Sequence, residues 1–151
     1  MTARKNQPLD PVQRAAHYNS HPSGVEAIDV VEDLPFNLGN AWKYVQRADE
    51  KGATLQDLEK ALWYIRREAH RHRILARSKR LPREVKVRSS VEILVRRYLR
   101  HEGGLRRDFF AHVWGAYVAG SREGGNGSLP HLAQAELLLS QVIREKKEVR
   151  S

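Results

Sequence analysis

Apolar residues at helical spacing constrain the fold of this chain more than any other feature. Between residues 36 and 51 they recur every three or four positions, as Leu38, Ala41, Trp42, Val45 and Ala48. This interval places side chains on one side of a helix, which is the side that a globular protein buries. The same pattern returns between residues 54 and 77, after a short Gly-Ala turn. Two helices joined by so short a turn are expected to pack antiparallel.

The rest of the chain repeats this pattern, which predicts an all-α bundle of about five or six helices. A first helix is expected from Ser23 to Pro35, and others over about 91–101, 105–119 and 129–148. Residues 84–88 alternate and could pair as a short strand, whereas the glycine-rich residues 120–128 predict a flexible linker. We expect a flexible arm over residues 1–16 and a helical region with the site over 17–78. Residues 79–151 would complete the same compact domain or form an oligomerisation region.

Composition excludes several classes of protein. The chain has 151 residues and no cysteine, so disulfides, thiol nucleophiles and cysteine-ligated zinc or iron–sulfur sites are excluded. No haem, flavin, zinc or iron–sulfur cofactor is expected. It has no apolar run of the roughly 20 residues that a membrane span needs. Residues 1–8 lack the apolar segment of a signal peptide. We therefore expect a cytoplasmic protein with no membrane partner.

Positive charge is concentrated in one block of the sequence. Residues 66–100 hold 13 Lys or Arg and 3 Glu, a balance of +10, while the rest of the chain sums to −1 against a total of +9. Such a block raises the local concentration of phosphate-bearing partners. It predicts either nucleic acid or free nucleotides as partners, and composition does not distinguish the two.

Polar residues on the two central helices form a second pattern. On the helix over 36–51 they are Asn40, Lys43, Tyr44, Arg47 and Lys51. On the next helix they are Asp57, Lys60, Tyr64 and Arg67. Residues three and four apart are neighbours on a helix, so each set lies on one face. Cations, an amide and phenols together suit an anionic, partly aromatic ligand such as a nucleotide, although a solvated basic face is the alternative.

Two short patterns near the start of the chain concern possible acids and metal ligands. Ser23-Gly24-Val25-Glu26 has the form of a capping box, which gives Glu26 a structural role. Asp29 has no such local role, so it is the more informative acid. His17 and His21 are four residues apart, but Pro22 keeps His21 out of helical geometry, and a metal site on this pair is not expected. Residues 120–128 half resemble a phosphate-binding loop but lack its lysine.

The order of these residues resembles a known family. The run begins with His17-Tyr18 and passes through Glu26 and Asp29. It continues with Gly39-Asn40-x-x-Lys43-Tyr44-x-x-Arg47, then Lys51-Gly52, then Asp57-x-x-Lys60-Ala61-x-x-Tyr64. It is similar to the SaV-like family of small phage proteins, also called phage nucleotide kinases. The resemblance covers about residues 17–68 and does not extend to residues 69–151.

The resemblance implies a phage or prophage protein of nucleotide metabolism, acting in the cytoplasm of a bacterial host. Some members phosphorylate deoxynucleoside monophosphates without a Walker loop, and others have no assigned activity. In a kinase with ATP as donor, Lys43, Arg47 and Lys60 would neutralise phosphate oxygens. Asp29 would hold Mg²⁺ or orient the attacking oxygen, assisted by Glu26. Substrate-binding residues would be His17, Tyr18, Asn40, Tyr44, Lys51, Lys60 and Tyr64, with Tyr18, Tyr44 or Trp63 stacking on a base.

Alternative interpretations stay open at this point. A protein that only sequesters nucleotides would use the same cations without needing Asp29, and a nucleic-acid-binding protein would use the block from Arg66 to Arg100. Ion pairs of Lys43 and Lys60 with Asp29 and Asp57 are the structural explanation for the two lysines. The aromatic residues of the helix over 105–119 either pack on the first helices or form a subunit interface, so we expect a homo-oligomer.

Overall fold

The fold is all-α, as predicted. The computed structural model describes residues 21–48, 54–78 and 86–150, and these residues form helices and no strand. The helices are α2 (Ala27–Val31), α3 (Phe36–Arg47), α4 (Thr54–Ser78), α5 (Ser89–Arg100), α6 (Gly104–Glu123) and α7 (Gly125–Arg150). Among the described residues, no helix combines the length and apolar character needed to cross a membrane. The predicted arm over 1–16 and residues 84 and 85 of the predicted strand over 84–88 lie outside the described residues, and residues 86–88 are irregular and form no strand.

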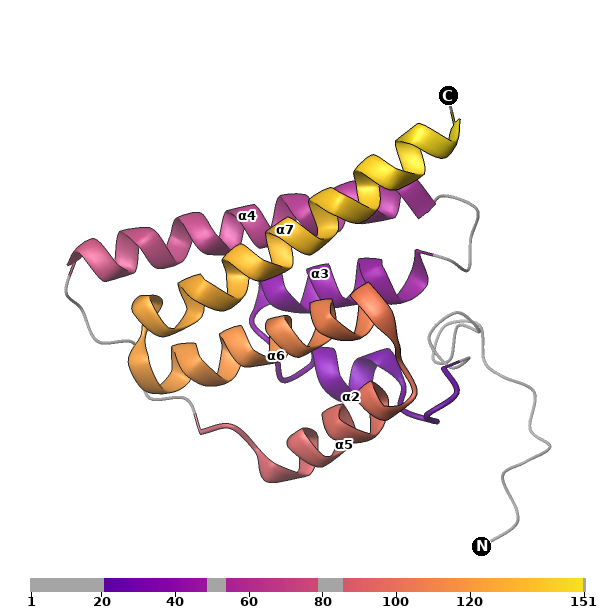
Figure 1. The fold of residues 1–151 in the computed structure, drawn as a ribbon. Helices are drawn as coiled ribbons and strands as arrows, with labels where there is room; N and C mark the ends of the chain where they lie inside the picture. The colour runs from indigo at the N-terminus through magenta and orange to yellow at the C-terminus, as the bar shows by residue number, and fades with distance from the viewer. Residues whose placement is uncertain (1–20, 49–53, 79–85, 151) are drawn as a thin grey trace, which may run out of the picture.

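The helices form a layered bundle with the two longest on one side. Figure 1 shows α4 and α7 together on that side, α3 and α6 in the middle, and α2 and α5 on the far side. The most extensive helix contacts are α6 with α7, α4 with α7, and α3 with α4. The pair α3 and α4 runs antiparallel, as the short connection between them predicts (Figure 1). Because α6 and α7 pack on this pair, they belong to the same compact domain.

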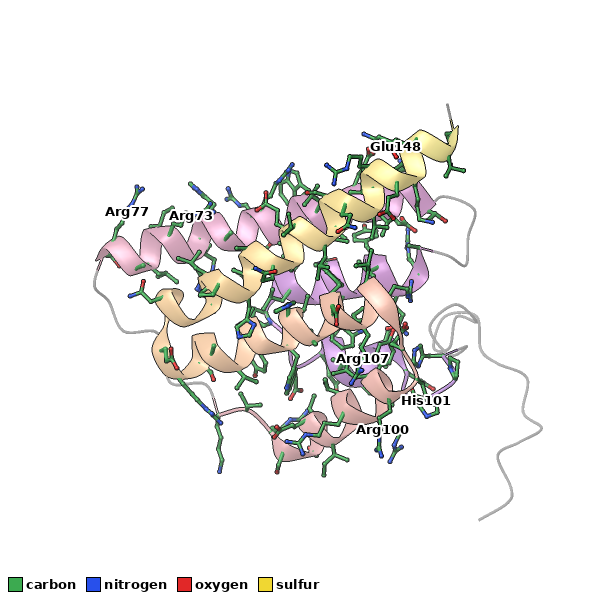
Figure 2. The ribbon with its side chains drawn as sticks, viewed as in Figure 1. Arg73, Arg77, Arg100, His101, Arg107 and Glu148 are labelled. Carbon is green, nitrogen blue, oxygen red and sulfur yellow. The ribbon has the colours of Figure 1, made fainter. Side chains whose placement is uncertain are left out.

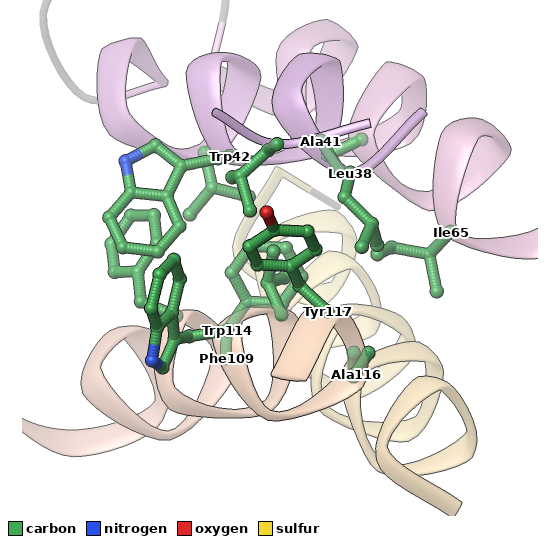
Figure 3. Close-up of a cluster of buried hydrophobic side chains, with 14 of the residues drawn as sticks. Leu38, Ala41, Trp42, Ile65, Phe109, Trp114, Ala116 and Tyr117 are labelled. Carbon is green, nitrogen blue, oxygen red and sulfur yellow. The ribbon is translucent and has the colours of Figure 1, made fainter. Parts of the chain in front are cut away.

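An aromatic cluster joins α3, α5 and α6 at the centre of the bundle. The buried Trp42 ring on α3 lies 4.5 Å from the Phe110 ring and 5.2 Å from the Tyr98 ring, measured between centroids. Figure 3 shows Trp42 on one side of the core facing Phe109 and Trp114 of α6 on the other. The aromatic face of α6 is thus buried within the chain. This aromatic face, on which the expectation of a homo-oligomer depends, is therefore covered without a second subunit.

The predicted flexible linker over 120–128 is wrong. The helix α6 continues to Glu123, Gly124 makes the turn with a φ of 71°, and α7 begins at the next residue. Glycine is needed here because the two backbones approach closely: a Cβ on Gly127 would lie 2.7 Å from the Ala119 carbonyl oxygen. The buried Ser128 hydroxyl donates a hydrogen bond of 2.7 Å to the Ala116 carbonyl oxygen. The glycines allow a tight helical hairpin, which composition alone does not distinguish from a linker.

Candidate functional site

Six of the predicted site residues meet on one face of the α3–α4 pair. We call Asn40, Lys43, Tyr44, Arg47, Lys60 and Tyr64 the Tyr44 platform. The opposite face of α3 is buried in the core, so the helical spacing fixes which residues point outward. The antiparallel packing of α4 then brings Lys60 and Tyr64 beside Tyr44. The predicted convergence of the two polar faces is confirmed.

Three cations surround the Tyr44 ring. The Lys43 Nζ and Arg47 Cζ atoms each lie 4.9 Å from the ring centroid, and the Lys60 Nζ atom lies 5.3 Å from it. A cation within this range is attracted by the ring quadrupole, by about 0.5–1 kcal/mol at an exposed position. Two of these cations are lysines that form no ion pair among the described residues, so an anion bound beside the ring would offset their charge.

One of the three cations is held by a buried acid. The Arg47 guanidinium donates two hydrogen bonds of 3.2 Å to the two oxygens of Asp57, whose side chain is only 1% exposed. The fork geometry fixes the guanidinium in orientation as well as in position. Asp57 thus accepts from α3 although it lies in the first turn of α4. The Thr54 hydroxyl donates to the Ala48 carbonyl oxygen.

The two lysines of the platform are not neutralised in the described part of the chain. The Lys43 ammonium donates a hydrogen bond of 3.2 Å to the Asn40 side-chain oxygen, and the Asn40 amide donates to the Phe36 carbonyl oxygen at 2.8 Å. Among the described residues, neither Lys43 nor Lys60 forms an ion pair. The ion pairs of these lysines with Asp29 and Asp57 that the sequence suggested are therefore absent.

Exposed aromatic rings extend the platform along both helices. The Tyr44 and Tyr64 rings are nearly parallel, at 14°, with centroids 6.0 Å apart. Trp63 and Phe36 contact Tyr64 edge to face, at 5.1 Å and 5.9 Å. Trp63 is 59% exposed and Phe36 is 74% exposed, which is unusual for large apolar rings. Sequence reasoning missed Phe36, although it precedes Asn40 by four residues and so lies on the same face.

Asp29 has a structural role that the sequence did not reveal. The helix α2 begins after Glu26, and the Asp29 carboxylate accepts a hydrogen bond of 3.0 Å from the Glu26 backbone N–H. The Glu26 side chain accepts in turn from the Asp29 backbone, which completes a capping box. The predicted box between Ser23 and Glu26 is wrong by one turn, because Gly24 has a φ of 74° and cannot be helical. Asp29 therefore has a local structural role, and the lack of such a role no longer marks it as a catalytic acid.

The acids of α2 do not form a metal site in the described part of the chain. No group of three or more His, Asp or Glu side chains there is arranged to hold a metal ion. A Mg²⁺ ion prefers several oxygen ligands and keeps water on the remaining positions. Asp29 already uses one oxygen within its own helix. The described residues therefore bring no cluster of three such ligands to Asp29, and the Mg²⁺ site expected there stays a prediction.

The described parts of the basic block over residues 66–100 lie on two different helices. Its first part lies on α4 and its last part on α5, and these helices lie on opposite sides of the bundle (Figure 1). Figure 2 shows Arg73 and Arg77 projecting from α4 on one side and Arg100 projecting on the other. Some of its charge is also compensated, as by the 2.9 Å ion pair of Arg66 with Glu136. A continuous track for a nucleic acid is therefore not formed by the described part of the block.

Two cavities of about 650 Å³ each lie elsewhere on the described bundle. The first is mainly apolar and lies where α3, α4, α6 and α7 meet, with Leu58, Phe109 and Leu139 in its wall. The second lies between α4 and α7, beside Trp63. Neither cavity is lined by the Tyr44 platform, which is an outer surface of the bundle.

Comparison with known proteins adds one family. The model of a family described as Protein of unknown function (DUF3310) matches residues 12–66. No curated protein matches the chain, and no solved structure matches it. The matched range contains α2, α3 and the first half of α4, and therefore the whole Tyr44 platform. The predicted site residues His17, Tyr18 and Lys51 also fall in this range but lie outside the described residues.

Proposed function

We propose that this chain binds nucleotides at the Tyr44 platform and does not transfer phosphate. The observation that carries this proposal is the pair of lysines, without ion pairs in the described chain, beside one tyrosine ring and next to two exposed aromatic rings. A phosphate would lie between Lys43 and Lys60, where it offsets the charge of the two lysines. Arg47 would add a third contact from a fixed orientation, because Asp57 holds it.

The base would stack on the exposed aromatic rings and not on Tyr44. The Tyr44 ring is already occupied by the three cations and by Tyr64. Trp63 and Phe36 both contact Tyr64 and are exposed, and stacking of a base on an aromatic side chain is worth about 1–3 kcal/mol. Stacking tolerates every base, so this arrangement favours broad recognition of nucleotides.

Binding is favoured over phosphoryl transfer because the catalytic acid has no support. Asp29 serves as a helix cap, and among the described residues no group of three or more acids or histidines is arranged to hold a metal ion. Phosphoryl transfer depends on metal ions and on a residue that orients the nucleophile. Simple sequestration needs only the cations and the rings.

The fluorescence of Trp63 provides a direct test. Trp63 is 59% exposed, whereas Trp42 and Trp114 are buried and only 0% and 9% exposed. A stacked base should therefore quench mainly Trp63. Titration with nucleoside monophosphates should quench the wild type in a saturable way, and Trp63→Phe should lose this signal. Lys43→Ala or Lys60→Ala should weaken binding about 10- to 100-fold, since a charge-assisted hydrogen bond contributes about 1.5–3 kcal/mol.

Matched controls distinguish this proposal from the alternatives. Lys86→Ala removes an exposed lysine that precedes α5, on the far side of the bundle, and should leave binding unchanged. Formation of a diphosphate from ATP and a deoxynucleoside monophosphate would refute the non-catalytic assignment and restore the kinase. No saturable quenching by any nucleotide, or equal binding by Lys43→Ala and the wild type, would refute the platform itself. Salt-dependent binding of random DNA lost on Arg73/Arg77 substitution, without nucleotide binding, would instead favour the basic block.

A further inference from the structure

Two histidines outside the platform face each other across the α6–α7 hairpin. The Nδ1 atom of His112 on α6 lies 3.1 Å from the Nδ1 atom of His131 on α7, with ring centroids 5.4 Å apart. Both side chains are partly exposed, so solutes reach them. When both rings are neutral, only one of the two facing nitrogens carries a hydrogen in this contact, since the other must accept it. At least one lone pair therefore points at the opposite ring.

The separation of the two nitrogens suits a shared metal ion. Zinc–imidazole bonds are about 2.0–2.1 Å long. Two such bonds to nitrogens 3.1 Å apart enclose an angle of about 100° at the metal. This follows because the sine of half the angle equals half the nitrogen separation divided by the bond length. That angle lies between the octahedral and tetrahedral values. Small ring movements would satisfy either geometry.

We propose that His112 and His131 bind one divalent late transition-metal ion, of the class of Zn²⁺, Ni²⁺ or Cu²⁺, through their two Nδ1 atoms. Imidazole nitrogen is the ligand that these ions prefer, whereas Mg²⁺ and Ca²⁺ prefer oxygen. On binding, the hydrogen at the facing nitrogens moves to Nε2 of the same ring, so two neutral histidines coordinate without net proton release. Water would complete the coordination.

Two neighbours strengthen the assignment. Asp108 lies one helical turn before His112 and its carboxylate is exposed, so its negative charge favours a cation beside that ring. Gly115 leaves room for the His131 ring: a Cβ there would lie 2.6 Å from Cε1 and 2.7 Å from Nδ1. The glycine thus lets His131 lie flat against α6 with Nδ1 directed at His112. The bound ion would connect the middle of α6 to the N-terminal part of α7.

Direct metal binding by the untagged full chain tests the proposal. Titration calorimetry of chelator-treated protein with ZnCl₂, NiCl₂ and CuCl₂ should give one site, and MgCl₂ should give none. His112→Ala and His131→Ala should each weaken binding at least tenfold. His70→Ala, which removes an exposed histidine from α4, is the matched control and should bind like the wild type. Excess Zn²⁺ should raise the melting temperature of the wild type and the control but not of the two alanine variants.

A second variant keeps the test independent of folding defects. Gly115→Ala retains both histidines and adds a good helix former, but its methyl group displaces the His131 ring. It should keep its helical circular dichroism and lose most of its metal affinity. The Cu²⁺-loaded wild type should show an electron paramagnetic resonance spectrum with two coordinated imidazole nitrogens. Equal affinities of the wild type, His112→Ala and His131→Ala, or a spectrum with no imidazole nitrogen, would overturn the proposal.

Discussion

Replacement of Asp57 by asparagine isolates the interaction that fixes the platform to the core. The Asp57 side chain is 1% exposed and accepts both of its hydrogen bonds from Arg47, which is 22% exposed. Asparagine has the same size but no charge, and its amide group would face the guanidinium. Breaking a fully buried pair costs about 3–5 kcal/mol, and partial access of water to Arg47 reduces this to about 2–3 kcal/mol. With a urea m-value of about 2 kcal/mol/M, the unfolding midpoint should fall by about 1–1.5 M.

The control for Asp57→Asn is an ion pair of the same type on the surface. Glu59 and Lys147 are 3.1 Å apart but are 47% and 58% exposed, so Glu59→Gln should cost about 0.5 kcal/mol or less. Replacement of both members of the pair, Arg47→Met with Asp57→Leu, should be less destabilising than Asp57→Asn, because the guanidinium and its buried carboxylate are removed together. Urea unfolding followed by circular dichroism measures all three. A midpoint for Asp57→Asn within about 0.3 M of that for Glu59→Gln would refute the reasoning.

Two further predictions concern the helical hairpin and a buried acid. Gly127→Ala should destabilise the fold by about 1–3 kcal/mol, because its methyl group would meet the Ala119 backbone, whereas Gly103→Ala meets nothing and should be nearly neutral in the same urea assay. Burial raises the pKa of Glu68 above its usual 4.5, so the folded state holds the proton more tightly than the unfolded state. The contribution of this protonated side chain to the stability is present at low pH and is lost as the pH rises through the pKa of the folded state. The free energy of unfolding of Glu68→Gln relative to that of the wild type should therefore increase from pH 4.5 to pH 8. A difference between the two that does not change with pH would contradict the raised pKa of Glu68.

The fold and the platform were predictable because both depend on helical periodicity. Spacing alone places Trp42 inward and Lys43, Tyr44 and Arg47 outward on α3, and the short connection places α4 antiparallel to it. These are local regularities that a single sequence carries. The alternation of buried and exposed positions leaves little freedom once the helix is assigned.

The errors have a common physical cause, since each depends on a backbone detail or on a distant partner. Asp29 was singled out because the start of α2 was placed one turn early, and only the positive φ of Gly24 corrects it. An ion pair of Asp57 with Lys43 or Lys60 is wrong, because its partner Arg47 lies ten residues away on α3. The glycines over 120–128 suit a linker or a close helix contact, and the choice depends on α6 and α7 meeting.

The two halves of the chain contribute different things to the site. The matched range over residues 12–66 carries every residue of the Tyr44 platform. The inner faces of α3 and of the first half of α4, which lie in this range, are apolar and must be covered by other helices. Trp42 and Ile65 are fully buried, and the aromatic residues of α6 and the long helix α7 supply the surfaces that cover α3 and α4. Removal of α6 and α7 would expose that core to water, at roughly 25 cal/mol per Å² of apolar surface. The platform therefore depends on residues that carry no binding group, because they hold α3 and α4 at the distance where Lys43 and Lys60 reach one ring.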